Sequence, residues 1–292
     1  MKYYRHFDCR EKSSKMSNSL RFRIASFFAM TIPYGFIVLL FTCFAANAQL
    51  KQVAQIDTVA KSVYADNLDN IYLLSDRDEL LKYDAKGKLK WRYSNNRFGK
   101  LHSVDVSDPL RVVLFYADFQ QVVVLNNNLN EITSYSFAKD GNLLVSTIAS
   151  GNNNSLWIFD RSANALIKLS SNFTEDVRSA NLFQLFDEVV DAKKMVASDQ
   201  YVFLQRKNEG VLQFDRFGGY VRELPIDSLS DFNITSNVIA YFKGSDLIRY
   251  HPATFESSRQ KLPVSLPIRQ VAVGNKLIAV LTEKAVFLLS DN

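Results

Sequence analysis

Short apolar runs that end in a polar turn-forming residue recur along this chain. At six places an apolar or aromatic residue is followed directly by Asp, Asn, Ser or His, and successive places lie 42, 44, 45, 36 and 39 residues apart. The six pairs are Tyr83-Asp84, Leu125-Asn126, Leu169-Ser170, Phe214-Asp215, Tyr250-His251 and Leu289-Ser290. A repeat of about 40 residues, built from short strands, is typical of β-propeller blades. The spacing therefore predicts six blades.

The first repeat divides into four predicted strands, which cover residues 62–65, 70–75, 79–83 and 88–93. The turn at 84–87 ends in Gly87, where we expect a positive φ, and the fourth repeat has the related turn 215–219. The second repeat has Asn126, Asn127 and Asn128 at this place, and Asn also tolerates left-handed backbone conformations. These turns predict hairpins between the last two strands of each blade.

The second strand of the later repeats is continuously apolar rather than alternating. Continuous apolar strands are buried on both faces, as they would be between neighbouring blades. These strands cover residues 112–116, 156–159, 201–204, 238–242 and 277–281.

The last repeat supplies only three predicted strands, at 268–273, 277–281 and 285–289, and residues 49–59 are the candidate for the fourth. We therefore predict an all-β, six-bladed β-propeller whose ring is closed by an N-terminal strand that completes the last blade. A β-sandwich with accidental periodicity is the alternative. Within residues 170–192, the stretch 181–190 fits either a short amphipathic helix inserted between blades or the outer strand of the third blade.

The first 48 residues carry the excess of positive charge. They hold seven Lys and Arg against Asp8 and Glu11, so the rest of the chain has 28 basic and 28 acidic side chains. A neutral folded part gives no support for a nucleic-acid partner. An apolar stretch at 24–46 follows Arg21 and Arg23 and leads to Ala46-Asn47-Ala48. We predict a signal peptide over 1–48, cleaved after Ala48, and a single propeller domain over 49–292.

An uncleaved membrane anchor is the alternative for the leader, because its apolar run is long enough to span a bilayer. Both cysteines, Cys9 and Cys43, lie in this leader. The exported chain is therefore predicted to have no disulfide, no thiolate nucleophile and no Cys-bound metal. Its two histidines, His102 and His251, are too few for an ordinary zinc site, and no catalytic or phosphate-binding motif is present. We expect no cofactor, no bound metal and no catalytic residue.

Residues 64–93 resemble a repeat of the six-bladed propellers of the NHL and YVTN type. In that superfamily a strand of small residues leads to Asn-x-Tyr-x-x-Asp and then to a hydrophobic strand that ends in Asp-x-x-Gly. Asn70 and Tyr72 supply the first two named positions of the first motif, and Asp84 and Gly87 supply the second motif. The layout and the leader also resemble uncharacterised envelope propeller proteins of Bacteroidetes-type bacteria. The Gly-x-x-x-Trp pattern of quinoprotein repeats occurs once, ending at Trp91, which argues against a quinone cofactor.

Charged residues follow the second predicted strand of most repeats and occupy the link into the second blade. In a propeller these turns and links emerge on one face, around the mouth of the channel. The residues predicted to bind a partner on this face are Asp76, Arg77, Arg97, His102, Asp118, Arg161, Arg206, Lys207 and Glu283.

Two functions compete. The first is an exported, non-catalytic propeller that acts as a binding or scaffold module in the bacterial cell envelope. Its predicted place is the periplasm or the outer membrane, and release from the cell is the less favoured alternative. It would hold a protein or glycan partner, touch the membrane at most peripherally and be monomeric. The alternative is a metal-dependent hydrolase or lyase similar to the six-bladed lactonases, in which Asp76, Asp118 and Glu283 would converge on a divalent metal.

Overall fold

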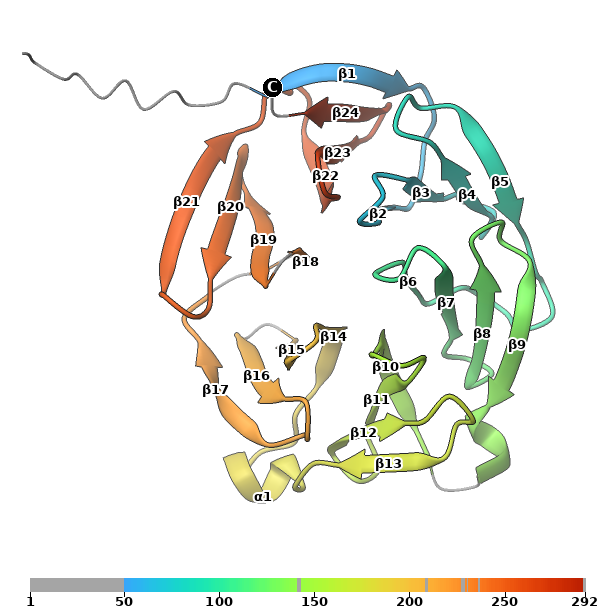
Figure 1. Cartoon of the computed structure of the whole chain (residues 1–292), viewed down its shortest axis with the longest axis vertical. Helices are drawn as coiled ribbons and strands as arrows, with labels where there is room; N and C mark the ends of the chain where they lie inside the picture. Colours follow the sequence, from blue (N-terminus) through green and yellow to red (C-terminus); the bar gives the residue numbers. More distant parts are fainter. Residues whose placement is uncertain are drawn as a thin grey trace, which may run out of the picture. The chain divides into compact units, whose positions relative to one another are not determined.

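The computed structural model describes residues 50–140, 143–207, 210–226, 229, 231–235 and 237–290. In this part the chain forms six four-stranded antiparallel sheets. Figure 1 shows these sheets arranged as blades around a central axis, with the first strand of each blade nearest the centre. This arrangement confirms the predicted all-β, six-bladed propeller.

Each blade runs from an innermost to an outermost strand. Blade 1 consists of β2 (Ser62–Ala65), β3 (Ile71–Leu74), β4 (Leu80–Tyr83) and β5 (Leu89–Tyr93). Blade 2 consists of β6 (Ser103–Asp105), β7 (Arg111–Tyr116), β8 (Gln121–Asn126) and β9 (Glu131–Ser136), followed by the short 3-10 helix η1 (Phe137–Asp140). Blade 3 consists of β10 (Val145–Ser150), β11 (Leu156–Asp160), β12 (Ala165–Leu169) and β13 (Glu175–Arg178).

The second half of the ring follows the same order. Blade 4 consists of β14 (Ala192–Ala197), β15 (Tyr201–Arg206), β16 (Val211–Asp215) and β17 (Tyr220–Leu224). Blade 5 consists of β18 (Asn233–Thr235), β19 (Val238–Lys243), β20 (Asp246–His251) and β21 (Glu256–Lys261). Blade 6 consists of β22 (Ile268–Val273), β23 (Leu277–Thr282), β24 (Val286–Ser290) and β1 (Lys51–Ile56).

Blade 6 is completed by the strand that comes before blade 1. β1 pairs antiparallel with β24, so that Ile56 lies opposite Val286. The carboxylate of Asp69, in the turn between β2 and β3, adds a second connection, because it accepts hydrogen bonds from the backbone N–H groups of Lys276 and Leu277 at 2.8 and 3.0 Å. The predicted closure is confirmed, and it covers an edge that could otherwise pair with another chain.

The repeated polar residue after the third strand closes a turn of one design. The carboxylate of Asp84 accepts hydrogen bonds from the backbone N–H groups two and four residues later, at 3.0 and 2.9 Å. Asn126, Ser170 and Asp215 make the same two bonds in the next three blades. The third residue after each polar residue has a positive φ; these residues are Gly87 (75°), Leu129 (59°), Phe173 (61°) and Gly218 (78°).

The turn of blade 2 differs from the prediction in one respect. Its left-handed residue is Leu129, whereas Asn126, Asn127 and Asn128 were expected to take that conformation. The side chain of Asn126 is occupied by the two hydrogen bonds that close the turn. Leu129 is 3% exposed and packs in the core, which compensates for its backbone strain.

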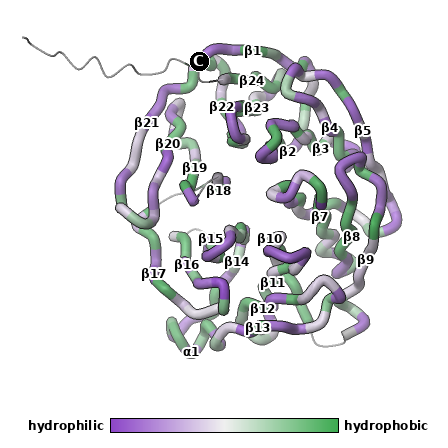
Figure 2. The backbone as a smooth tube through the Cα atoms, in the orientation of Figure 1, coloured by the Kyte–Doolittle hydropathy of each residue, from purple (hydrophilic) through white to green (hydrophobic). Residues whose placement is uncertain are grey.

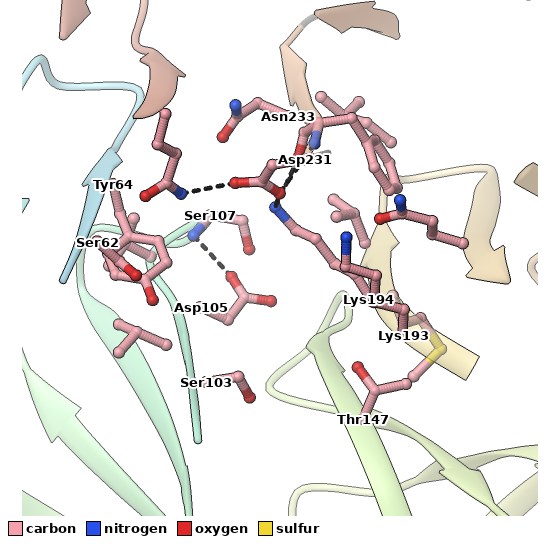
Figure 3. Close-up of a pocket in the computed structure, with 18 of the residues that line it drawn as sticks. Ser62, Tyr64, Ser103, Asp105, Ser107, Thr147, Lys193, Lys194, Asp231 and Asn233 are labelled. Atoms are coloured by element: carbon pink, nitrogen blue, oxygen red, sulfur yellow. Dashed lines mark hydrogen bonds and ion pairs between the residues drawn. The ribbon is translucent and has the colours of Figure 1, made fainter. Parts of the chain in front are cut away.

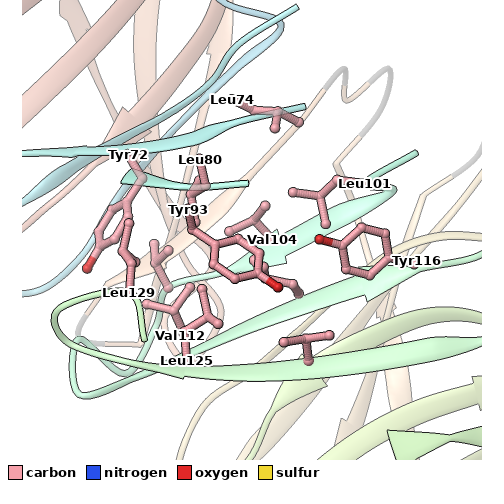
Figure 4. Packing of buried hydrophobic residues seen from close by; sticks show 13 residues of the cluster. Tyr72, Leu74, Leu80, Tyr93, Leu101, Val104, Val112, Tyr116, Leu125 and Leu129 are labelled. Carbon is pink, nitrogen blue, oxygen red and sulfur yellow. The ribbon is translucent and has the colours of Figure 1, made fainter. Parts of the chain in front are cut away.

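The core consists of six apolar clusters, one at each seam between neighbouring blades. Figure 4 shows the cluster between blades 1 and 2, where Tyr72 and Leu80 of one blade face Val112 and Leu125 of the other. The second and third strands supply most of the buried residues, as their continuous apolar runs predicted. Outermost strands such as β9 and β21 are mainly exposed, and much of their length is hydrophilic (Figure 2).

Residues 175–190 contain both of the elements that the sequence suggested. β13 is the outer strand of blade 3, and the short helix α1 (Leu182–Phe186) follows it in the link to blade 4. The side chain of Asn181 caps the helix by accepting a hydrogen bond from the backbone N–H of Gln184 at 3.2 Å. Leu182 is buried between blades 3 and 4 and Phe186 is partly buried against the same cluster, so two apolar residues anchor the helix.

The predicted signal peptide, residues 1–48, lies outside the described residues, and its cleavage after Ala48 stays a prediction. In the part of the chain that the structure describes, no helix has the length and apolar character needed to cross a membrane.

Candidate functional site

A cavity of about 430 Å³ occupies the centre of the ring and is lined by residues from the innermost strands of all six blades. It opens on the face that carries the links between blades and the turns between second and third strands; we call this the linker face. Links and turns meet there, as the 2.7 Å ion pair between Lys61 and Asp78 shows. The ionisable side chains that line the cavity are Lys61, Tyr64, His102, Asp105, Lys193, Lys194, Asp231 and Arg269.

Bulges shape the cavity wall in three blades. The first two strands of blades 3, 4 and 6 each shift register by one residue, at Ser146, Lys193 and Arg269. The corresponding pairs in blades 1, 2 and 5 have no such shift. A bulge lets two consecutive residues point to the same side of a strand. Lys193 and Lys194 of blade 4 and Arg269 and Gln270 of blade 6 line the cavity, as do the consecutive residues Ser103, Val104 and Asp105 of the regular strand β6.

A chain of hydrogen bonds crosses the cavity wall from blade 4 to blade 1. The Nζ of Lys194 donates to Oδ1 of Asp231 at 2.5 Å, and the Nε2 of Gln270 donates to Oδ2 of the same carboxylate at 2.6 Å. The backbone N–H of Val63, in β2, then donates to Oε1 of Gln270 at 2.9 Å. Figure 3 shows the carboxylate of Asp231 beside the side chain of Lys194. The chain fixes the position of the Asp231 carboxylate.

Asp105, at the end of β6, holds a comparable place between blades 2 and 3. Its Oδ1 accepts from the backbone N–H of Ser107 at 2.8 Å, and its Oδ2 accepts from the backbone N–H of Ser150, in β10, at 2.7 Å. Arg111, which follows on β7, donates to the carbonyl oxygen of Ser155 at 3.1 Å. Burial lowers the pKa of Arg111, and the charge of Asp105 opposes this effect.

Tyr64 is the aromatic side chain of β2 at the cavity, on the side of Asp105 in Figure 3. Burial raises the pKa of Tyr64 to about 12; a hydrogen bond with Ser62 acts in the opposite direction, and the negative charge of Asp231 adds to the rise. The phenol therefore stays protonated at neutral pH and can donate a hydrogen bond.

Of the nine residues predicted to bind a partner, His102 lines the cavity, where its ring packs edge-on against Phe115. Of the other eight, seven lie in the turns and links of the linker face and are exposed, and Arg206 is the last residue of β15 and is partly buried. Their role in binding stays a prediction.

Several charges of the linker face pair with one another. Arg206 bridges Glu188 and Glu223 at 2.8 and 2.5 Å, and its side chain is only 12% exposed. Lys207 lies 3.8 Å from Asp191. Arg97 lies 3.5 Å from Glu131 on the neighbouring blade. Arg206 therefore connects the link before blade 4 with the outer strand β17, whereas the exposed pairs of Arg97 and Lys207 contribute little to stability.

The carboxylates expected to converge on a metal do not form a group. Asp76, Asp118 and Glu283 lie in the turns of blades 1, 2 and 6. Among the described residues, no three His, Cys, Asp or Glu side chains come together in a way that could hold a metal ion.

The sequence did not point to Lys194, Asp231, Arg269 and Gln270. None of the nine residues predicted to bind a partner comes from the first strand of a repeat. Polar residues at the start of an otherwise apolar strand, as in the Lys193-Lys194-Met195-Val196 and Arg269-Gln270-Val271 runs, were the available signal.

The sequence matches no known protein family and no curated protein. The structure, in contrast, resembles 1044 solved chains. One is a streptogramin B lyase, with a TM-score of 0.57, 10% identity, and coverage of 83% of this chain and 97% of that chain. Another is the WD40 domain of Pan2 from Neurospora crassa, with a TM-score of 0.56, 7% identity and coverage of 84% and 96%.

A third similar structure is PorZ of Porphyromonas gingivalis, described as an essential bacterial surface component of the type-IX secretion system. It matches with a TM-score of 0.53 and 12% identity, over 81% of this chain and 31% of PorZ. Identities this low support the architecture only. A lyase, a WD40 domain and a secretion component share the ring, so function has to be argued from the residues of this chain.

Proposed function

We propose that this protein is an exported, non-catalytic binding or scaffold module of the bacterial cell envelope that holds a protein or glycan partner on its linker face. The observation that carries the proposal is the central cavity, which opens on that face and is lined by polar side chains from all six blades. A rigid ring of this kind positions several loops around one opening, which suits the binding of a partner at several points.

The position of the charges supports this proposal over the alternative of a hydrolase or lyase. The cavity carboxylates of Asp105 and Asp231 each accept two or more hydrogen bonds, and neither belongs to a metal-binding group of three or more His, Cys, Asp or Glu among the residues that the structure describes. PorZ gives this fold a precedent at a bacterial surface. The leader predicted over 1–48 supports the periplasm or the outer membrane as the place of action.

The test is recovery of partners by the tagged propeller, residues 49–292, from lightly cross-linked envelope, followed by mass spectrometry. The rim variant carries Asp76→Asn, Arg77→Gln and Arg161→Gln, all at exposed positions of the linker face. The matched control carries Asp199→Asn, Lys86→Gln and Arg216→Gln, which change the net charge equally in turns on the opposite face.

We expect a stoichiometric partner that the rim variant retains at least tenfold less, a loss of about 1.4 kcal/mol. The control variant should retain it normally. Equal retention by the folded rim variant and the control would contradict the proposed use of the linker face. Recovery of no partner by the unmodified propeller would contradict the scaffold function itself.

A further inference from the structure

The cavity wall has more positive than negative groups. Lys61, Lys193, Lys194 and Arg269 line it, against the carboxylates of Asp105 and Asp231. Lys61 is paired with Asp78 outside the lining. A cavity with a surplus of cationic groups at its mouth favours an anionic ligand.

Both cavity carboxylates are already supplied with donors. Asp231 accepts from Lys194, from Gln270 and, at 2.9 Å, from the backbone N–H of Phe232. Asp105 accepts from two backbone N–H groups. A carboxylate has about four acceptor sites, so these bonds fix both side chains in place and leave about one site on Asp231 and two on Asp105. The two acids therefore act as fixed parts of the wall.

The donors are in surplus, in contrast. The ammonium group of Lys194 has three hydrogens, and two of them reach Asp231 and the carbonyl oxygen of Phe232, at 2.5 and 2.6 Å. The guanidinium group of Arg269 has five N–H donors, and one nitrogen donates to the carbonyl oxygen of Ala60 at 3.2 Å. The complement of several N–H donors with positive charge is a carboxylate, which offers two oxygens to a fork of donors.

A buried acceptor lies in the same lining. Gln205 is 2% exposed, and its Nε2 donates to the carbonyl oxygen of Leu229 at 2.8 Å, but its Oε1 has no hydrogen-bond partner. A buried polar atom without a partner is uncommon and points to a missing group. A ligand that carries a donor next to its carboxylate would satisfy it, and the last peptide N–H of a polypeptide has this arrangement.

The opposite mouth of the channel has a different character. It is lined by Asp66 and Asp199 and by the amides of Asn67, Asn237 and Asn275, with no Lys or Arg among its described lining residues. The channel is therefore polarised, with its cations towards the linker face. An anionic group is favoured at that end and disfavoured at the other.

From these contacts we propose that the cavity is a carboxylate-binding site, which takes the C-terminal carboxylate of a polypeptide through Lys193, Lys194 and Arg269 and its adjacent N–H through Gln205. This inference rests on the proposed function, because it names the chemical group that a protein partner inserts from the linker face. A small free carboxylic acid offers the same charge without the peptide N–H.

The test is a titration of the propeller with N-acetyl-trialanine as the free acid, with the same peptide as its C-terminal amide, and with succinate, all at constant chloride. We expect the free acid to bind at least tenfold more tightly than the amide. Weaker binding by succinate than by the peptide acid supports the polypeptide source. Equal binding by succinate overturns that part of the proposal and leaves a small acid as the ligand.

Two double variants separate the cavity from the overall charge of the protein. Lys193→Gln with Arg269→Gln should raise the Kd of the peptide acid at least tenfold, whereas Lys86→Gln with Arg216→Gln, an equal change of charge in exposed turns on the opposite face, should leave it within about twofold. Equal effects of the two pairs, or equal binding of acid and amide, would overturn the proposal. Because the peptide titration needs no partner, its failure is distinguishable from a failure of partner recovery.

Discussion

Asp66 organises a buried network at the turn between β2 and β3, and its removal gives a sharp test of how blade 1 is held. The side chain is 1% exposed and accepts four hydrogen bonds. Two come from the backbone N–H groups of Leu68 and Asn70, one from the Nδ2 of Asn70 at 2.8 Å, and one from the hydroxyl of Tyr72 at 2.9 Å. Burial, together with the nearby charge of Asp66, raises the pKa of Tyr72, so its hydroxyl remains a donor.

The size of the effect follows from these partners. Asp66→Ala removes hydrogen bonds to a charged acceptor, worth roughly 1.5–3 kcal/mol, and leaves the Tyr72 hydroxyl buried without a partner at roughly 1–3 kcal/mol more. We expect a loss of about 4 kcal/mol in the free energy of unfolding, which lowers the Tm of a domain of this size by on the order of 10 °C. Tyr72→Phe should cost only about 1.5 kcal/mol, because the carboxylate keeps its other three donors.

The double variant separates the two contributions. Asp66→Ala with Tyr72→Phe no longer buries an unpaired hydroxyl, so its cost should fall short of the sum of the single costs by about 1–2 kcal/mol. Asp84→Ala is the matched control, because Asp84 makes the same two backbone bonds without a buried hydroxyl. This control substitution should lower the free energy of unfolding by about 1 kcal/mol.

Equilibrium unfolding in urea measures all four variants, with constant m-values as the check that only stability has changed. Two outcomes would refute the reasoning. One is an equal cost for Asp66→Ala and Asp84→Ala, which would mean that the buried hydroxyl does not matter. The other is additivity of the Asp66 and Tyr72 costs to within about 0.5 kcal/mol, which would mean that the two side chains are not coupled.

Two further predictions concern the turns and the buried tyrosines. Gly218→Ala should lower the free energy of unfolding by about 2 kcal/mol or more, because φ is +78° and a Cβ atom would lie 3.2 Å from the backbone nitrogen of Ser179. Gly244→Ala (φ +64°) is the control; its Cβ atom meets open space, so it should cost about 1 kcal/mol. Equal losses in urea unfolding would contradict the role of the Ser179 contact. Burial raises the pKa of Tyr64 and Tyr116 to about 12. Between about pH 10 and 12 the folded state therefore holds more protons than the unfolded state, and the free energy of unfolding falls as the pH rises. The decline is up to roughly 1.4 kcal/mol per pH unit for each tyrosine. Replacing both tyrosines with Phe should flatten the alkaline decline of the urea midpoint, and an unchanged slope would contradict the assignment.

The ring was predictable because the features that build a blade are local. Asp84 and Asp215 close hairpins within four residues of themselves, and Gly87 and Gly218 supply the left-handed residue of those hairpins. A repeat of such turns at a nearly constant spacing leaves few folds other than a ring of blades. Even the closing strand could be inferred, since the last repeat lacked one strand.

The cavity was harder to predict because its residues come from separate repeats. Lys194 belongs to blade 4, Asp231 to the link before blade 5, and Gln270 to blade 6, yet one carboxylate joins all three. Nothing in the spacing of these residues indicates that they meet. Contacts across the seams between blades were hidden from the sequence for the same reason. Lys82 is 6% exposed and donates a hydrogen bond to the carbonyl oxygen of Asn127 in the next blade at 2.9 Å, although its sequence position resembles that of an exposed strand residue.

The lining residues of the innermost strands do not follow the alternating pattern of a strand. Lys193 and Arg269 are the residues at which blades 4 and 6 shift register, and both line the cavity together with Lys194 and Gln270. Ser103, Val104 and Asp105 are consecutive residues of the regular strand β6, and they line the cavity as well. Each innermost strand is the edge of its sheet beside the channel, so consecutive residues can contribute to the lining whether or not the strand is bulged. A prediction that assigns one face of each strand to the core therefore cannot say which polar residues meet in the cavity.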